Sequence, residues 1–363
     1  AVVERVAASV RARAERRDPQ TARDLVVLHG GEPLLRKALV HHTVELLLDE
    51  AGERLCDFAI VTNGSLLDDE VLELFARHHF RVDVSFDGCR EAQAFRDAGS
   101  FELVVDNLRR LIELHGRGLL ELRVAMTLTL DNLPYLARSV EFLTDLGAPT
   151  ILIEGDGFGP WREGAEKLLE EQVEQVVQAM QLRLAAGLPV PVRRLAPLPS
   201  MERARSTQSV LSRLAAGECG CGAEGASVID ADGSVWACPL FIPDLGKVAS
   251  GRLKDPDAFR LGAWTATEEP NPAQLAARAQ ELKKEPILGP KRERWSRFGT
   301  CSTCRFVADC TACPAASHLP DVRKTPQEVP PLLCAINMAF LARRERMRRA
   351  PNLTDILFAV AGA

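Results

Sequence analysis

The stretch LVVLHGGEPLL, residues 25–35, joins an apolar run to a loop that contains two glycines, an acid and a proline. Its first four residues predict a buried strand, and Gly30 and Gly31 follow the end of that strand. Glycines at a strand end are typical of a backbone that another group approaches closely. Pro33 has the φ that suits a first helical residue, so we expect a helix to begin there. The stretch therefore predicts a strand, a loop open to a binding partner, and a helix.

The same order of strand and helix continues through the first half of the chain. Each connection is long enough for a helical crossover, and the strands are apolar runs because parallel strands are buried on both faces. We therefore expect an α/β fold built on a parallel sheet. Helical spacing is present at 2–10, 36–53, 69–79, 101–115, 133–146 and 165–186, and strands are predicted at 25–29, 57–62, 81–85, 122–130 and 150–154.

Small residues or glycines, together with hydrogen-bonding residues, lie at the end of each predicted strand. The carboxyl ends of parallel strands meet on one rim, so these loops would together line a pocket for a small polar cofactor. Each loop taken alone is equally consistent with an ordinary turn that caps the next helix. The five loops are 30–33, 62–65, 85–88, 127–132 and 154–157.

Cysteines are concentrated in the second half, where eight of the ten lie after residue 218. A secreted disulfide scaffold would be short and would spread its cysteines evenly. Residues 301–314 read CSTCRFVADCTACP, and pairs at this spacing hold metal from a tight turn in both zinc and iron–sulfur sites. The spacing alone does not decide whether the cysteines bind zinc, bind iron–sulfur clusters or are free buried thiols. The eight cysteines are Cys219, Cys221, Cys238, Cys301, Cys304, Cys310, Cys313 and Cys334.

Composition limits the class of protein. The chain has 46% apolar and 26% charged residues, typical of a globular protein, and its net charge of −5 lacks the basic surplus of a nucleic-acid binder. No apolar run reaches the ~18 residues of a membrane span, and the opening residues lack the order of a secretory signal. We therefore expect a cytoplasmic protein with no nucleic-acid or membrane partner.

Prolines between 189 and 199 predict a linker, beyond which the alternation of helix and strand stops. Asp232-Gly233, flanked by Val-Ile and Val-Trp, predicts a β-hairpin that brings Cys238 back toward Cys221. The expected division is a first domain at 1–187, a linker at 188–217, a cysteine-rich domain at 218–345 and a tail at 346–363.

GGEP at 30–33, TNG at 62–64 and SFDG at 85–88 together resemble the motifs of the radical S-adenosylmethionine (SAM) enzymes. The resemblance implies a partial (β/α)6 barrel that lacks its first strand. It assigns Gly30, Gly31 and Glu32 to the methionyl amino group of SAM. It also assigns Asn63 and Ser85 to the ribose or carboxylate of that cofactor.

The cysteine framework resembles the SPASM domain that follows the barrel in part of this family and holds two auxiliary 4Fe-4S clusters. Two residues separate Cys310 from Cys313, where the family has three. The resemblance places Cys219, Cys221, Cys238 and Cys313 on an inner cluster, and Cys301, Cys304, Cys310 and Cys334 on an outer cluster.

The three-cysteine motif that holds the SAM-cleaving cluster in this family is absent from the chain. In the family it precedes the helix with which this chain opens. We therefore expect missing upstream residues that supply this third cluster. The alternative is a degenerate member that does not cleave SAM.

The resemblance implies cleavage of SAM to a 5'-deoxyadenosyl radical, which takes a hydrogen atom from a peptide or protein substrate, with a ferredoxin or flavodoxin as reductant. The protein would position the cofactor and exclude water. Pro239 stands where the sulfatase-maturing enzymes of this group have an aspartate, which argues against that subgroup. A sulfatase-maturase-like enzyme and a non-catalytic iron–sulfur or zinc scaffold remain alternatives. No general base is assigned, although Glu154, Asp156 and Asp244 are the nearest acids.

Overall fold

The computed structural model describes residues 3–4, 6–7, 10–11, 24–51, 56–156, 162, 164–195, 228–239, 242, 259–263, 272–284, 299–306, 310 and 331–348. Among the described residues, no helix is long and apolar enough to cross a membrane. The chain divides into two compact units. One unit contains Ala1–Ala22 and Pro199–Cys334, and the other contains Arg23–Leu198 and Ala335–Ala363.

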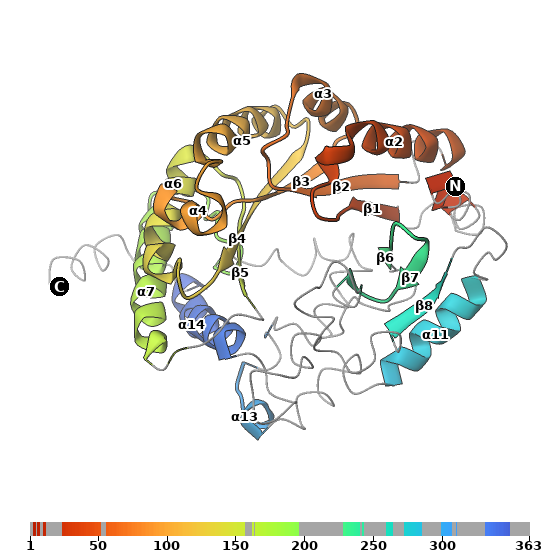
Figure 1. Ribbon diagram of the computed structural model, residues 1–363. Helices are drawn as coiled ribbons and strands as arrows, with labels where there is room; N and C mark the ends of the chain where they lie inside the picture. The colour runs from red at the N-terminus through yellow and green to blue at the C-terminus, as the bar shows by residue number, and fades with distance from the viewer. Residues whose placement is uncertain are drawn as a thin grey trace, which may run out of the picture. The chain divides into compact units, whose positions relative to one another are not determined.

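A parallel five-stranded sheet forms the centre of the second of these units, with the strands in sequence order. Helices connect successive strands and lie along the outer side of the curved sheet (Figure 1). This is the predicted α/β fold, and the predicted strands and helices agree with the observed ones to within about two residues at most ends. The strands are β1 (Asp24–Leu28), β2 (Cys56–Thr62), β3 (Arg81–Ser85), β4 (Glu121–Leu128) and β5 (Ile151–Gly155). The long helices are α2 (Lys37–Ala51), α3 (Asp69–Arg77), α5 (Phe101–Gly116), α6 (Leu136–Leu146) and α7 (Ala165–Ala185).

The two faces of the sheet differ in polarity because successive side chains along a strand point to opposite faces. From β2 to β5 the outer face is mainly apolar and buried, with Phe58, Ile60, Val82, Val84, Val124 and Ile153 each at most 2% exposed. The inner face is more polar: Asp83 of β3 lies opposite Arg123 of β4 and forms a two-point ion pair with it. The apolar face therefore stabilises the fold, while the polar side chains of the inner face are available for interactions other than core packing.

One helix between the strands of this sheet was not predicted from the sequence. Residues Arg90–Asp97 form α4, directly after the SFDG loop. Its buried residues are Ala92 and Gln93, so it lacks the repeating apolar positions by which a helix is recognised in a sequence. Short 3₁₀ turns also precede two of the helices, η1 (Pro33–Arg36) before α2 and η2 (Leu133–Tyr135) before α6.

The start of the proline-rich stretch extends the sheet beyond β5. Val192 forms a parallel bridge with Ile151. The backbone nitrogen of Ile151 donates to the carbonyl oxygen of Pro191 at 2.8 Å, and that of Arg193 donates to Ile151 at 3.0 Å. These residues belong to the segment that the sequence predicts as a linker. The domain limits given in the sequence analysis stay a prediction.

The other unit contains a small antiparallel sheet of β6 (Val228–Ile229), β7 (Ser234–Trp236) and β8 (Arg260–Ala263), in that order. The predicted Asp-Gly hairpin between β6 and β7 is confirmed. Gly233 has a φ of 88° and donates to the carbonyl oxygen of Asp230 at 2.9 Å, which closes the turn. Helices α11 (Pro272–Lys284) and α13 (Gly299–Ser302) also belong here, whereas Cys221 lies outside the described residues.

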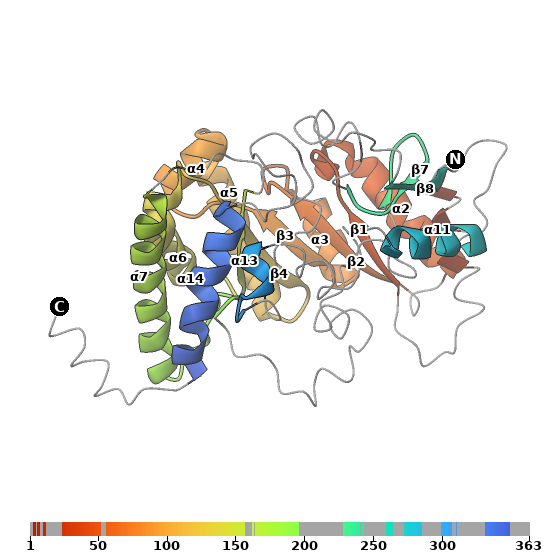
Figure 2. The same ribbon diagram turned by 90° about the horizontal axis from the view of Figure 1, so that it is seen from below.

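Helix α14 (Pro331–Arg348) continues from the last residue of the first unit, Cys334, into the second unit. Figures 1 and 2 both show α14 beside α7. An ion pair joins the two helices, in which Nε of Arg343 donates to Oε2 of Glu174 at 2.9 Å.

Gly88 in the SFDG loop gives a direct test of the packing around the strand ends. Its φ is 100°, and a Cβ placed there would lie 2.3 Å from Cβ of Ser139. We expect Gly88→Ala to lose about 1–2 kcal/mol to the left-handed backbone and about 1–3 kcal/mol more to the steric clash. Gly118 has a φ of 72° with no atom within 4 Å of an added Cβ, so Gly118→Ala should lose only the first amount. Chemical denaturation of both variants checks this, and equal losses would contradict the packing described.

Candidate functional site

The carboxylate of Glu32 ties the loop after β1 to the end of β2. Its Oε1 accepts from the backbone nitrogen of Leu34 at 3.1 Å and from Oγ1 of Thr62 at 2.8 Å. Its Oε2 accepts from the backbone nitrogen of Asn63 at 2.7 Å. Because a carboxylate has about four acceptor positions, three bonds leave room for one further donor. Glu32 thus has a structural role that the sequence did not predict, beside its expected role toward a cofactor.

Gly30 and Gly31 have no structural reason to be glycine in the part of the chain that is described. Neither has a positive φ, and no atom lies within 4 Å of a Cβ built on either residue. Gly64 in the next loop is different, because its φ is 75° and an added Cβ would lie 3.0 Å from Cγ1 of Val84. Gly64 is therefore explained by the fold, whereas the glycine pair leaves open space beside an accessible backbone.

Asn63 and Ser85 lie at the ends of neighbouring strands on the same rim. Oδ1 of Asn63 accepts from both the backbone nitrogen and the hydroxyl of Ser65, at 2.9 and 2.7 Å, so this end of its amide is used within the turn. Ser85 is the last residue of β3, is half-buried, and pairs with Ala125 of β4. The structure therefore places Glu32, Asn63 and Ser85 on adjacent strand ends.

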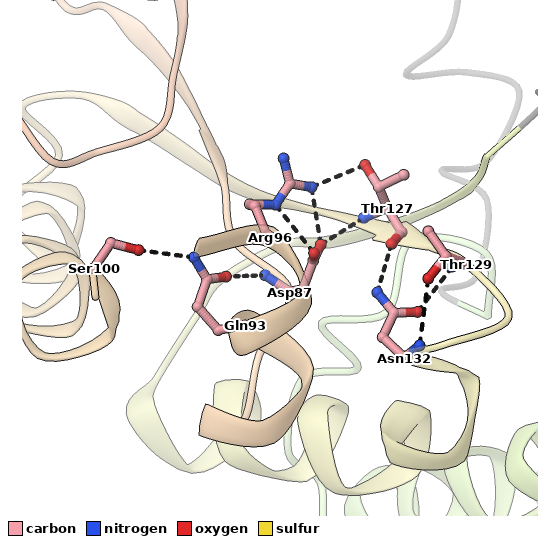
Figure 3. Close-up of polar contacts among 7 residues, drawn as sticks. All are labelled: Asp87, Gln93, Arg96, Ser100, Thr127, Thr129 and Asn132. Carbon is pink, nitrogen blue, oxygen red and sulfur yellow. Dashed lines mark hydrogen bonds and ion pairs between the residues drawn. The ribbon is translucent and has the colours of Figure 1, made fainter. Parts of the chain in front are cut away.

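The carboxylate of Asp87 is the centre of a hydrogen-bond network at the ends of β3 and β4 (Figure 3). Its side chain is 5% exposed. Arg96 of α4 donates to both of its oxygens, from Nε at 3.0 Å and from Nη2 at 2.9 Å. The backbone nitrogen of Thr127 donates to Oδ1 at 2.9 Å, and Arg96 Nη2 also donates to the Thr127 hydroxyl at 3.0 Å. Asp87 therefore joins β3, α4 and the end of β4 through one carboxylate.

Two buried amides complete this network. Oε1 of Gln93 accepts from the backbone nitrogen of Asp87 at 2.9 Å. Nδ2 of Asn132 donates to the carbonyl oxygen of Thr127 at 2.8 Å. In Figure 3 the third guanidinium nitrogen of Arg96 points away from Asp87 and Thr127, at the rim formed by the strand ends. The sequence drew attention to the SFDG loop but missed Arg96, because α4 was not predicted.

Glu154, one of the acids considered as a base, is held in an ion pair. Nη2 of Arg194 donates to its Oε2 at 3.0 Å, while Nε of the same guanidinium donates to the carbonyl oxygen of Ile153 at 2.7 Å. Nη1 donates to Oδ1 of Asn337, which is buried on α14, at 2.9 Å. Arg194 therefore ties the end of β5 to the C-terminal helix. Asp244 lies outside the described residues.

Three of the cysteines predicted for an outer cluster are neighbours. Burial raises the pKa of the Cys334 thiol, and the nearby charges of Cys310 and Cys304 raise it further. The backbone nitrogen of Cys304 donates to the carbonyl oxygen of Cys301 at 3.1 Å, which forms the tight turn expected for this spacing. Like-charged thiolates disfavour one another without a cation between them, so this donor set suits a bound zinc ion or an iron–sulfur cluster.

Cys238 is 5% exposed and follows β7. The other three cysteines predicted for the inner cluster, Cys219, Cys221 and Cys313, lie outside the described residues. Across the residues that are described, no three His, Cys, Asp or Glu side chains are placed to bind one metal ion. Cysteine ligands of a 4Fe-4S cluster each bind a different iron, which is a different arrangement from ligands of one ion.

Residues 2–143 match the radical SAM superfamily. This part of the chain, less than half of its length, is similar to that superfamily. The match includes β1 to β4 and therefore the loops that contain Glu32, Asn63, Ser85 and Asp87. The resemblance that the sequence motifs indicate is thus confirmed for the radical SAM domain.

Two curated relatives match shorter segments. The chain is 30% identical over 131 residues to a probable GTP 3',8-cyclase of Methanocaldococcus jannaschii, which covers 36% of this chain and 42% of that protein. It is 41% identical over 68 residues to a serine-type anaerobic sulfatase-maturating enzyme of Bacteroides thetaiotaomicron, which covers 18% of this chain and 16% of that protein. The matched segments therefore span less than half of either relative.

Solved structures share the fold over nearly the whole length. Native anSMEcpe with bound AdoMet and Kp18Cys peptide aligns with a TM-score of 0.65 at 16% identity, and covers 96% of this chain and 89% of that chain. Native anSMEcpe with bound AdoMet has the same TM-score and identity, with coverage of 98% and 90%. These likenesses confirm the α/β radical SAM fold.

The Asp87 network predicts a marked loss of stability when its charge is removed. Asp87→Asn keeps the size of the side chain but breaks a buried ion pair, so we expect a loss of about 3 kcal/mol in the free energy of unfolding. Asp106→Asn is the matched control, because Asp106 pairs with Arg109 at the surface, where such a pair contributes under ~1 kcal/mol. Thermal or chemical unfolding compares the two, and a similar loss in both variants would show that Asp87 does not hold the strand ends together.

Proposed function

We propose that the protein is a radical SAM enzyme that modifies a peptide or protein substrate and holds two auxiliary 4Fe-4S clusters. The observation that carries the proposal is the loop after β1. There, a glycine pair with open space beside it is held against the end of β2 by Glu32, within the segment that matches the superfamily. Bound SAM would supply a 5'-deoxyadenosyl radical for hydrogen abstraction.

The rim residues would bind and orient this cofactor. The backbone carbonyls of Gly30 and Gly31 are accessible to the methionyl amino group, and the remaining acceptor position of Glu32 would offset its positive charge. Asn63 and Ser85 would contact the ribose or carboxylate of SAM from the next two strand ends. Because Asp87 and Glu32 fix the loops between them, the site would be largely formed before the cofactor binds.

Cysteines of the second half would hold the auxiliary clusters. The mutual influence of Cys304, Cys310 and Cys334 supports one cluster, which Cys301 would complete. The second would be held by Cys219, Cys221, Cys238 and Cys313. A ferredoxin or flavodoxin in the cytoplasm would provide electrons.

A peptide or protein substrate is favoured by the fold neighbour native anSMEcpe, whose structure contains a bound Kp18Cys peptide. The segment shared with a serine-type sulfatase-maturating enzyme favours that activity as a second candidate. Pro239 disfavours it, because the sulfatase maturases of this group carry an aspartate at that position. A non-catalytic scaffold is the third candidate.

Metal analysis of the full-length protein, purified and reconstituted without oxygen, tests the proposal. We expect iron and acid-labile sulfide in equal amounts, and 5'-deoxyadenosine when SAM and a low-potential reductant are added. Zinc without labile sulfide would contradict the cluster assignment. Clusters without any 5'-deoxyadenosine would instead support the scaffold.

The glycine pair predicts a variant that separates binding from folding. Gly31→Ala adds a methyl group where no described atom lies within 4 Å and where φ is not strained, so the midpoint of unfolding should not change. The same methyl group would meet the bound cofactor, and we expect SAM affinity to fall at least tenfold, or about 1.4 kcal/mol. Equilibrium dialysis with labelled SAM measures this.

Gly116→Ala is the matched control, because Gly116 also has open space and no positive φ but lies at the end of α5. It should leave both stability and SAM affinity unchanged. Unchanged SAM binding by Gly31→Ala would mean that the cofactor does not approach this loop.

A further inference from the structure

Asn107 is a polar residue on the buried face of α5. It is only 4% exposed. Asparagine lowers helix propensity, and a buried amide is unfavourable unless it is hydrogen-bonded. Neither the helix nor the apolar core therefore accounts for an asparagine at this position, and its hydrogen bonds must account for it. The other buried residues of α5 are Phe101, Val104, Val105, Leu108 and Leu111.

The side-chain amide of Asn107 has a partner at each of its two polar atoms. Its Nδ2 donates to the backbone carbonyl oxygen of Gly64, in the loop after β2, at 2.8 Å. Its Oδ1 accepts from Nη1 of Arg110, one turn further along α5, at 3.5 Å. A carbonyl oxygen can only accept and a guanidinium can only donate, so the two partners agree on the orientation of the amide. Asn107 therefore presents a fixed donor to the loop after β2.

The same loop is also held by residues of the first two strand ends. Oε2 of Glu32 accepts from the backbone nitrogen of Asn63 at 2.7 Å. Oγ1 of Thr62 accepts from the backbone nitrogen of Gly64 at 3.1 Å. The bond from Asn107 adds the carbonyl oxygen of Gly64 to these contacts. The backbone on both sides of the Asn63 side chain is therefore fixed, and the contact on its C-terminal side depends on α5.

We propose that Asn107 is a positioning residue for SAM, which holds the carbonyl oxygen of Gly64 and so fixes the Asn63 side chain in the place where it binds the cofactor. This inference rests on the proposed function, in which Asn63 contacts the ribose or carboxylate of SAM. Loops are less stable than the elements they connect, and ordering a loop on binding lowers affinity. A loop that Asn107 orders beforehand avoids this loss.

Asn107→Asp tests the proposal in the full-length reconstituted protein. It keeps the size of the side chain but places an acceptor where the carbonyl oxygen of Gly64 needs a donor. We expect SAM affinity to fall about tenfold, the effect of leaving one buried acceptor unpaired. Equilibrium dialysis with labelled SAM measures this. Without SAM, hydrogen exchange followed by mass spectrometry should show faster exchange in the loop at 62–65.

Leu111→Ala is the matched control, because Leu111 is fully buried one turn beyond Asn107 on the same helix and has no polar atom to offer the loop. The cavity that it leaves should lower the stability of the protein. SAM affinity of the folded protein and exchange in the loop should be unchanged. An equal loss of SAM affinity in Leu111→Ala and Asn107→Asp, or no loss in Asn107→Asp, would overturn the inference.

A double-mutant cycle separates positioning from a general structural role. If Asn107 acts through Asn63, Asn107→Asp should lower SAM affinity by less than about twofold in protein that already contains Asn63→Ala, because the two changes are then not additive. The same tenfold loss in both backgrounds would refute the inference while the proposed function stands. Asn107→Ala, which removes the donor without adding an acceptor, replaces Asn107→Asp in the cycle if that variant does not fold.

The unmodified protein and the single variant Asn63→Ala test the premise. Asn63→Ala should itself weaken SAM binding, and unchanged binding would refute the role that the proposed function gives to Asn63. Failure of the unmodified, reconstituted protein to bind SAM would refute the proposed function itself.

Discussion

One buried carboxylate, that of Asp87, holds the functional rim of the barrel in shape. It accepts three hydrogen bonds, two from Arg96 of α4 and one from the backbone of Thr127. A sheet edge made of five separate loops would otherwise depend on loop conformations of low intrinsic stability. Glu32 makes a similar connection between the first two strands, so the ends of β1 and β2 and those of β3 and β4 are each joined by charge-assisted hydrogen bonds, which are stronger than neutral ones. Rigid loops of this kind are what a small polar cofactor requires for a fixed orientation.

The two faces of the parallel sheet differ in what their side chains contribute. From β2 to β5 its outer residues are mainly apolar and buried under the helices, and its inner residues include the Asp83–Arg123 pair and Ser85. Substitutions on the outer face therefore change packing, while those on the inner face change what can bind.

Sequence periodicity was sufficient for the strands of the parallel sheet and for the long helices that follow them up to α7, because both follow from repeating buried positions. It failed for α4, whose buried residues are an alanine and a glutamine. Arg96 was missed for the same reason. It lies on α4, and this helix brings its guanidinium back to Asp87, just after the end of β3. Contacts between residues that are far apart in the sequence, such as Arg194 and Asn337, cannot be predicted from local sequence patterns. The motifs identified which loops matter, and only the coordinates distinguished Gly64, which the fold requires, from Gly30 and Gly31, which it does not.

The open space beside Gly30 and Gly31 has a practical consequence for how variants of this protein are judged. Neither packing nor backbone strain opposes a larger residue there, so a screen based on solubility, expression or melting temperature would pass such variants as normal. Prediction methods that score substitutions by folding energy would make the same error. Under the proposed function, damage at this loop would be silent until the cofactor is added. A loop position that no described atom packs against is therefore one where sequence variation needs a binding assay.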